Sequence, residues 1–174
     1  ASIVLEEDGD NLYLYTASEV DKQVKEGDTE GISYLRKLNA LNGEIIWEKS
    51  YNCYYHEGVD GGVLATPVLG IGDMEGMVIY SVSRTGDSED HGLLVAVNKQ
   101  TGEIIWEQYM DRYSWSSPCA VYTSGGTGYL LQGDNGGNIV LRKGSTGEII
   151  DSVNIGSNVE ASPVVYNNML VVGT

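Results

Sequence analysis

An all-β fold is predicted by a short sequence motif that occurs three times in the chain. In its middle copy, an apolar segment ending at Asn98 is followed by a turn that contains Gly102 and by an apolar run ending at Trp106. Glycine tolerates the positive φ that a tight hairpin turn needs, so this motif predicts a strand, a turn and a second strand. The other two copies lie at residues 42–47 and 146–151.

A second marker, a hydroxyl residue followed by proline, recurs with a similar period. Each copy opens a short apolar run, and its prolines, Pro67, Pro118 and Pro163, lie 51 and 45 positions apart. Asp151 is the counterpart of Trp106 in the third copy of the hairpin motif. These two residues are also 45 positions apart. A repeat of about 45 residues is typical of four-stranded propeller blades. We therefore predict a β-propeller segment of about three and a half four-stranded antiparallel blades.

The apolar runs between the markers supply the individual strands. Residues 12–16 show the clearest pattern, because Leu and Tyr alternate there with a period of two. Residues 19–31 are polar and charged and are predicted to form a solvated loop, with a helical turn at 18–25 as an alternative. The predicted strands are 3–5, 12–16, 32–38 and 44–50 in blade one; 67–71, 77–82, 93–97 and 104–109 in blade two; 118–122, 129–132, 139–141 and 149–153 in blade three; and 163–166 and 169–172 in a partial fourth blade.

On these motifs, the chain resembles the PQQ-like (quinoprotein-like) β-propeller repeat family. That repeat reads Ala-x-Asp-x-x-Thr-Gly-x-x-x-Trp, and residues 96–106 match it except for Asn98 at the Asp position. The first copy keeps the Gly and Trp of the motif, and the third keeps its Thr and Gly. In the family, the Trp of one blade docks against the Thr-Gly turn of a neighbouring blade. The resemblance implies this role for Trp47 and Trp106, and it covers nearly the whole chain.

Composition limits the partners of the chain. The formal net charge of −15 argues against nucleic acid, whose phosphates would be repelled, and disfavours an anionic membrane surface. No apolar run approaches the ~18 residues that a spanning helix needs, so we predict no membrane insertion. Cys53 and Cys119 lie in different repeats. They are interpreted as unpaired thiols, with a bridge between a loop and an inner strand as the alternative.

Aromatic and acidic side chains gather in the loops of one predicted rim. Loops between blades and loops between second and third strands share this rim, whereas the Thr-Gly turns occupy the opposite one. Aromatic faces beside carboxylates and amides can bind sugar rings or extended peptides. The alternative is that these rings simply cover the ends of the blade cores. The predicted ligand-binding residues are Tyr54, Tyr55, His56, Tyr113 and Trp115.

Calcium is considered at Asp87 and Asp90, which lie in an oxygen-rich turn, and at residues 134–138, which form a second such turn. Their spacing does not fit an EF-hand loop, and Asp is a common turn residue. His56 and His91 have no second ligand at zinc spacing.

No motif of nucleophilic, phosphate-transfer or metalloprotease chemistry occurs in the sequence. The quinone-dependent dehydrogenases that this repeat resembles hold their cofactor with an adjacent pair of cysteines, whereas Cys53 and Cys119 are 66 positions apart. We therefore expect no catalytic residues and no cofactor.

The sequence thus predicts a non-enzymatic binding or scaffold module. Its rim would mediate protein–protein interaction or surface display, with a protein or glycan ligand that the sequence does not identify. The alternatives are a fragment of a larger quinoprotein-type dehydrogenase and a carbohydrate-binding propeller. The family resemblance places the chain outside the cytoplasm, as an extracellular, cell-surface or periplasmic protein.

The blade count predicts exposed apolar faces at the ends of the arc. Blades at about 2–51, 66–110 and 117–155 and a partial blade at 162–174 make residues 1–174 one propeller segment, and the smallest natural propellers close with ~4 blades. We therefore expect either a piece of a longer propeller or a homodimer in which two copies close one ring.

Overall fold

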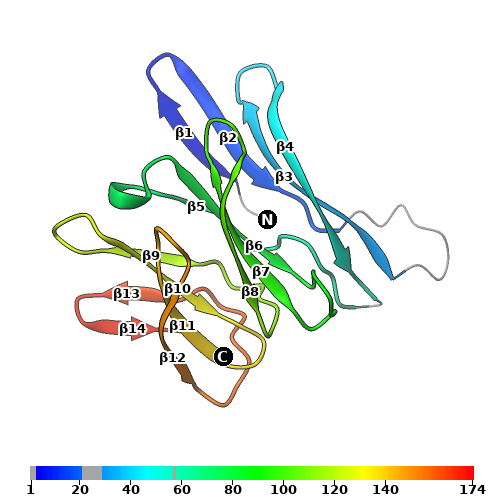
Figure 1. Cartoon of the computed structure of the whole chain (residues 1–174), viewed down its shortest axis with the longest axis vertical. Coiled ribbons are helices and arrows are strands. Elements are labelled where there is room, and N and C mark those ends of the chain that lie inside the picture. The colour runs from blue at the N-terminus through cyan, green and yellow to red at the C-terminus, as the bar shows by residue number, and fades with distance from the viewer. Residues whose placement is uncertain (1–2, 21–28, 57) are drawn as a thin grey trace.

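The protein forms an arc of three four-stranded antiparallel sheets and one two-stranded sheet. This computed structural model describes residues 3–20, 29–56 and 58–174. The sheets follow one another in chain order, and within each four-stranded sheet the strands pair in sequence (Figure 1). The strands are β1 (Val4–Asp8), β2 (Asn11–Ala17), β3 (Glu30–Asn39) and β4 (Ile45–Tyr54); β5 (Val68–Leu69), β6 (Met77–Ser83), β7 (Gly92–Asn98) and β8 (Ile104–Met110); β9 (Cys119–Tyr122), β10 (Gly128–Gly133), β11 (Asn138–Lys143) and β12 (Ile149–Asn154); and β13 (Val164–Tyr166) and β14 (Met169–Val171).

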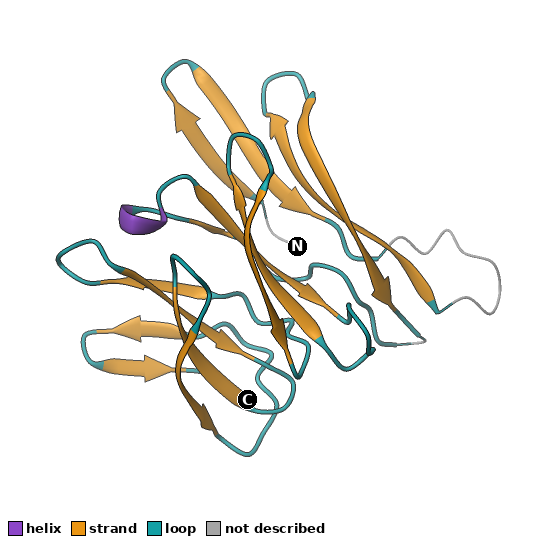
Figure 2. Ribbon diagram, in the orientation of Figure 1, coloured by secondary structure: helices purple, strands orange, loops and turns teal. Residues whose placement is uncertain are grey.

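This architecture confirms the predicted all-β propeller segment, and most strands lie within a few residues of their predicted positions. Two local predictions were wrong. The strand predicted at 67–71 is only Val68–Leu69, and the 3-10 helix η1 (Gly72–Met74) follows it (Figure 2). The strand predicted at 44–50 continues to Tyr54, so Tyr51 and Tyr54 belong to β4 and not to a loop. Most of the helical turn considered at 18–25 lies outside the described residues.

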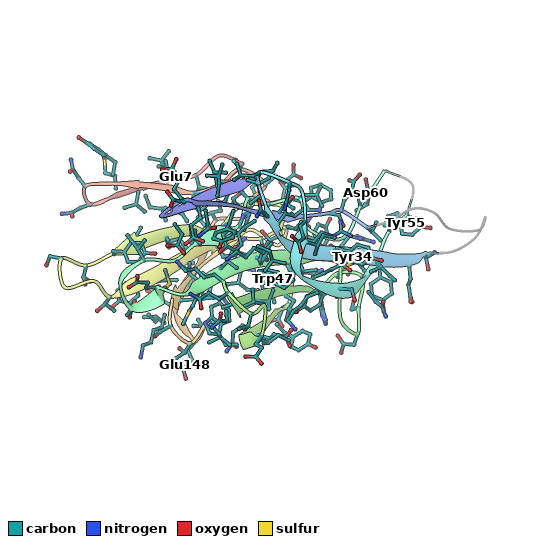
Figure 3. The ribbon with its side chains drawn as sticks, turned by 90° about the horizontal axis from the view of Figure 1, so that it is seen from above. Glu7, Tyr34, Trp47, Tyr55, Asp60 and Glu148 are labelled. Atoms are coloured by element: carbon teal, nitrogen blue, oxygen red, sulfur yellow. The ribbon has the colours of Figure 1, made fainter. Side chains whose placement is uncertain are left out.

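The first interface between sheets is built around Trp47, which is 8% exposed and lies among the strands in the interior of the molecule (Figure 3). Its indole Nε1 donates a hydrogen bond to the carbonyl oxygen of Lys99, 3.1 Å away in the hairpin turn of the next sheet. Gly102 in this turn has a φ of +73°, and a Cβ there would lie 2.8 Å from the indole ring. Only glycine combines this φ with this space. The Tyr15 hydroxyl reaches the same carbonyl at 3.2 Å.

The second interface repeats this contact one sheet further along the chain. Trp106 is also 8% exposed, and its Nε1 donates to the carbonyl oxygen of Gly144 at 3.2 Å. Gly147 has a φ of +72°, and a Cβ there would lie 2.7 Å from the Trp106 ring. The Gln108 amide adds a hydrogen bond to the Thr146 carbonyl at 3.2 Å. The docking role that the family resemblance implied for both tryptophans is thus confirmed.

A β-bulge at the same repeat position sets the direction of both indoles. Trp106 pairs with Ala96 and Ile104 pairs with Val97, so Ile105 is an extra residue in β8. The register of the first and third sheets shifts at the equivalent place. Because a bulge changes which way the following side chains point, it lets the residue after it face the neighbouring sheet.

The hydroxyl-proline markers link successive sheets at the beginning of their first strands. The backbone N–H of Thr66 donates to the Ser117 hydroxyl oxygen at 2.8 Å, and the N–H of Ser117 donates to the Ser162 hydroxyl oxygen at 3.1 Å. The second and third markers therefore use their serine side chains to accept a bond from the preceding sheet. The recurrence that defined the repeat in the sequence has a direct structural cause.

Two apolar clusters fill the spaces between the sheets. The first lies between sheets one and two and includes Tyr15, Leu35 and Trp47, and the second lies between sheets two and three and includes Trp106 and Leu130. Cys53 belongs to the first cluster and is unpaired, as is Cys119. Burial raises the pKa of the Cys53 thiol to about 11, so this side chain behaves as an apolar core residue at neutral pH. Within the described ranges, no helix has the length and apolar character of a membrane span.

Replacing Trp106 tests the docking contact. We expect Trp106→Ala to lower the free energy of unfolding by about 3–5 kcal/mol, as truncation of a buried aromatic residue does. The matched control is Asp151→Ala, because Asp151 occupies the same repeat position in β12 but is exposed. Its effect should stay within about 0.5 kcal/mol. Denaturant melts measure both values, and a loss below about 1 kcal/mol for Trp106→Ala would show that this ring is not a packing anchor.

The last sheet exposes the apolar side chains of a strand at its edge. Val171 in β14 is 57% exposed, Leu170 is 41% exposed and Met169 is 60% exposed. An exposed apolar edge favours pairing with another chain. This edge supports the predicted homodimer, which remains a proposal. We expect the chain to elute as a dimer at tens of micromolar in size exclusion with light scattering, and Val171→Lys to give a monomer. A monomeric wild-type chain, or a dimer that Val171→Lys leaves intact, would contradict this proposal.

Candidate functional site

The candidate site is organised by Arg84, which the sequence analysis did not single out. Arg84 directly follows β6, is 2% exposed and has a φ of 55°. Left-handed backbone is uncommon for a residue other than glycine and recurs at functional positions. One guanidinium nitrogen, Nη2, lies 2.9 Å from His56 Nδ1 and donates to Glu89 Oε2 at 2.8 Å. The guanidinium also lies 5.3 Å from the centre of the Tyr113 ring.

The Tyr113 and Trp115 rings form the aromatic part of the site. Their centres are 5.5 Å apart, and their planes are tilted by 47°. Trp115 Nε1 donates to the Asp60 carbonyl at 3.2 Å, and the Tyr113 hydroxyl accepts from the Asn135 amide at 2.7 Å. Tyr113 also donates its backbone N–H to the Asp90 carbonyl at 2.7 Å. Loops from sheets one, two and three therefore hold the two rings in place.

Tyr54 and Tyr55 approach the same rim from the end of β4. The backbone N–H of Tyr54 donates to the Arg84 carbonyl at 2.7 Å, and its hydroxyl lies 3.4 Å from the Gly86 carbonyl oxygen. Tyr55 is half-buried and packs against the first apolar cluster; it lies at the same end of the molecule as Asp60 (Figure 3). His56 and Tyr113 thus contact the Arg84 guanidinium, Tyr54 bonds to the Arg84 backbone, and Trp115 lies beside Tyr113. Tyr55 lies at the border between the core and the rim.

The two carboxylates considered for calcium have separate nitrogen partners. Asp87 Oδ1 lies 2.8 Å from His91 Nδ1, and this hydrogen bond lowers the pKa of Asp87. Asp90 Oδ2 lies 3.5 Å from the Arg112 guanidinium. Among the residues that the structure describes, no group of three or more acidic, His or Cys side chains is arranged to hold a metal. Calcium binding at Asp87 and Asp90 stays a prediction without structural support.

A pocket of about 600 Å³ opens beside the rim between the turn after β6 and the end of β8. Asp87 and His91 line one side, and Tyr109, Met110 and Asp111 line the other. The side chain of Asp87 is 87% exposed, and those of Glu89 and Asp90 are 58% exposed. The arrangement offers aromatic surface and several exposed carboxylates to a ligand, and the cations Arg84 and Arg112 pair with Glu89 and Asp90.

Removing the Arg84 side chain tests whether it organises this rim. Arg84→Met keeps a long apolar chain but loses the bonds to His56 and Glu89. We expect a loss of about 1–3 kcal/mol in the free energy of unfolding, because hydrogen bonds to a buried charged group are lost. Arg112→Met is the control, since Arg112 is exposed and its ion pair with Asp90 is long. Equal losses for both variants in urea melts would contradict the organising role of Arg84.

Comparison with known proteins agrees with this architecture. Residues 90–174 match a PQQ-repeat family model described as outer membrane protein assembly factor BamB. No curated protein matches the chain. The quinohemoprotein alcohol dehydrogenase from Comamonas testosteroni is similar in structure, with a TM-score of 0.55 and 12% sequence identity over 86% of this chain.

The chain covers 28% of the length of that dehydrogenase. BamB from Moraxella catarrhalis aligns over 97% of this chain and 77% of its own, with a TM-score of 0.38 and 15% identity. Residues 90–174 thus match the PQQ-repeat family, and the structural similarity shows the β-propeller fold over 86% of the chain.

Proposed function

We propose that the chain is a non-enzymatic binding module that holds an extended segment of a partner protein on its aromatic and acidic rim. The observation that carries this proposal is the cluster around Arg84, in which one buried guanidinium contacts His56, Glu89 and the ring of Tyr113. A rim that is pre-organised in this way loses little conformational entropy when a ligand binds.

The charge of the rim favours a basic segment. Asp87, Glu89 and Asp90 expose most of their side chains, and the whole chain carries a formal net charge of −15. Lys or Arg side chains of a partner would be attracted to these carboxylates, while Tyr113 and Trp115 offer apolar and cation–π contacts. Association should therefore weaken as the ionic strength rises.

The compartment is part of the proposal. The family model that matches residues 90–174 is described as an outer membrane protein assembly factor, which supports a location outside the cytoplasm, in the periplasm or at the cell surface. A piece of a quinoprotein-type dehydrogenase and a carbohydrate-binding propeller remain the alternatives, and the experiment below separates them from peptide binding.

A binding screen tests the proposal directly. The chain is applied to an array of extended peptides of graded charge and, in parallel, to a glycan array. We expect basic peptides that contain an aromatic residue to be retained. Trp115→Ala should weaken the binding of these peptides at least ~10-fold, since the variant loses the indole ring on which a peptide side chain would stack, together with its apolar area. The melting temperature of Trp115→Ala should change little, because the ring lies at the rim.

The control is Tyr166→Ala, which removes an aromatic side chain that is 71% exposed in β13. This variant should bind peptides as the wild type does. Retention of glycans alone would favour the carbohydrate alternative, and alcohol-dependent dye reduction on addition of pyrroloquinoline quinone would favour the dehydrogenase. Unchanged peptide binding by Trp115→Ala would contradict the proposed rim site.

A further inference from the structure

The two interfaces between sheets differ in chemistry at matched repeat positions. On the face of sheet two that packs against sheet one, the register pairs Val78 with Val97 and Tyr80 with Val95. The same register in sheet three pairs Leu130 with Arg142 and Gln132 with Val140. Arg142 therefore stands where sheet two has Val97, and Gln132 stands where it has Tyr80.

Two further positions show the same change. The pair of Val82 and Leu93 in sheet two corresponds to Asp134 and Asn138, which are joined by a backbone hydrogen bond at the end of β10 and β11. All six residues of sheet two belong to the first apolar cluster, whereas only Leu130 of the six residues in sheet three belongs to the second. At these positions sheet two has an apolar interface, whereas sheet three has four polar side chains.

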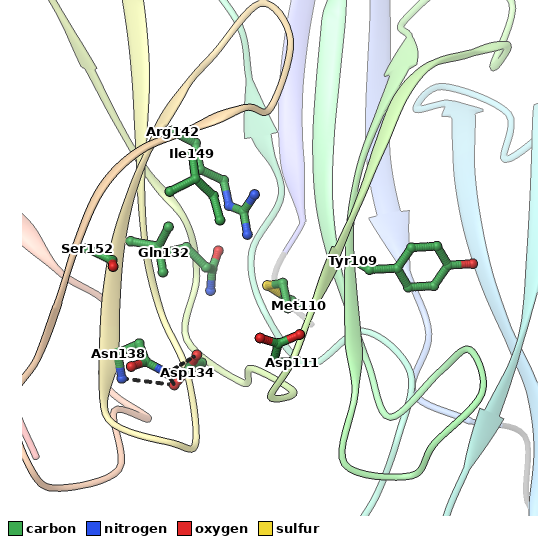
Figure 4. Close-up of a pocket in the computed structure, with 10 residues that line it drawn as sticks. Tyr109, Met110, Asp111, Gln132, Asp134, Asn138, Arg142, Ile149 and Ser152 are labelled. Atoms are coloured by element: carbon green, nitrogen blue, oxygen red, sulfur yellow. Dashed lines mark hydrogen bonds between the residues drawn. The ribbon is translucent and has the colours of Figure 1, made fainter.

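These polar side chains line a pocket of about 250 Å³ between β8 and the third sheet (Figure 4). Arg142 and Gln132 point toward a common space, which Met110 and Asp111 face from sheet two (Figure 4). Val140 and Ile149 add apolar surface to the lining. The volume lies below the range of about 300–1,000 Å³ that is usual for drug-sized ligands, so the pocket suits a smaller molecule.

Gln132 is fully buried, and its amide nitrogen has three acceptors in the protein. Nε2 donates toward the Ser114 hydroxyl at 2.6 Å and toward the carbonyls of Ser116 and Gly133 at 2.9 and 3.0 Å. These contacts fix the orientation of the amide. Its carbonyl oxygen, Oε1, is buried without a hydrogen-bond partner, although an unpaired buried acceptor is costly.

Arg142 shows the complementary deficit, a donor without an acceptor. The residue is 3% exposed, and one guanidinium nitrogen, Nη1, donates to the Gly147 carbonyl at 3.0 Å. Its Nε is buried and has no partner. The carboxylate of Asp134 is bonded to the backbone N–H and the amide of Asn138, and no ion pair within 4.0 Å joins it to Arg142 in the described part of the chain.

The chemistry that completes this pocket can be deduced from its unpaired atoms. Arg142 Nε calls for an anionic acceptor, whereas Gln132 Oε1 calls for a donor. The exposed carboxylate of Asp111 at the mouth favours a cationic donor over a neutral one. We propose that this pocket binds a small zwitterion of the amino-acid class, with its carboxylate on Arg142 and its ammonium group between Gln132 and Asp111. The side chain of the ligand would contact Met110, Val140 and Ile149. This site goes beyond the proposed peptide rim and does not depend on it.

Three matched probes test the proposal on the full chain. L-leucine carries both charges, N-acetyl-L-leucine lacks the ammonium group, and L-leucinamide lacks the carboxylate. In 1H–15N NMR spectra recorded up to 10 mM probe, we expect L-leucine to shift the Arg142 Nε–H signal and the amides of β10 and β11. Each capped probe should bind at least ~10-fold more weakly. No shift with L-leucine, L-valine or L-methionine, or equal binding of a capped probe, would overturn the proposal.

Variants chosen from the repeat itself give an independent test. Arg142→Val installs the residue that sheet two has at this position, so we expect it to abolish L-leucine binding while the melting temperature is kept or raised. Gln132→Leu should weaken binding at least ~10-fold, and it serves if Arg142→Val fails to fold. Lys143→Gln is the control, because Lys143 is an exposed cation next to Arg142 that does not line the pocket. Retained L-leucine binding in Gln132→Leu or Arg142→Val would overturn the assignment, as would its loss in Lys143→Gln.

Discussion

The contact between an indole ring and a left-handed glycine turn determines how the sheets of this protein are arranged. Trp47 and Trp106 each leave one sheet and donate to a turn carbonyl of the next. The turn must offer that carbonyl and must also leave room for the ring, and glycine at a φ near +70° meets both conditions. Because these contacts and the two apolar clusters join neighbouring sheets, the interfaces contribute as nearest-neighbour terms, as in other repeat proteins. The hydroxyl-proline markers add a second link between sheets two and three, through Thr66 and Ser117, so this pair is held at its first strand and at its last. The bond between Ser117 and Ser162 links sheet three to the last sheet.

Much of this arrangement could be predicted from the sequence because it depends on short motifs whose residues are close together in the chain. A glycine turn, a bulge and a Trp lie within about ten residues of one another, and the period between copies shows which sheet each belongs to. The strand from Ile45 to Tyr54 was predicted too short for the opposite reason. Its last residues pair with residues 30–33 of β3, and they also have partners in sheet two: Cys53 forms a β-bridge with Thr85, and the Tyr54 N–H donates to the Arg84 carbonyl. No pattern within residues 51–54 indicates those partners.

The aromatic residues of the candidate site were named from the sequence, and Arg84 at its centre was not. Tyr113 and Trp115 could be named because aromatic residues in a loop are visible in the sequence, whereas Tyr54 lies in β4 and not in the predicted loop. Their role in ligand binding stays a prediction. Arg84 was missed because its role comes from a left-handed φ of 55° and from burial, and both are set by tertiary packing. Its one local signal is a charged side chain directly after the apolar strand β6. Gln132 and Arg142 were missed in the same way, since the polar face of sheet three to which they belong appears only when the registers of two sheets are compared.

That comparison gives a physical reason for where function resides in such a fold. Positions that follow the repeat are occupied by the contacts that hold the sheets together, and a change there costs stability. Gln132 and Arg142 stand at positions where sheet two has buried tyrosine and valine, and burying Gln132 Oε1 and Arg142 Nε without partners is unfavourable by itself. The docking of Trp106 and the hydrogen bond from the Thr66 N–H to the Ser117 hydroxyl stabilise the same interface, so the fold can hold this polar pocket open. Sheets two and three have the same register, so each residue in sheet three can be compared with the residue at the same position in sheet two. Where an apolar packing residue is replaced by a polar one, as Val97 is by Arg142, the position is a candidate for ligand binding and not for packing.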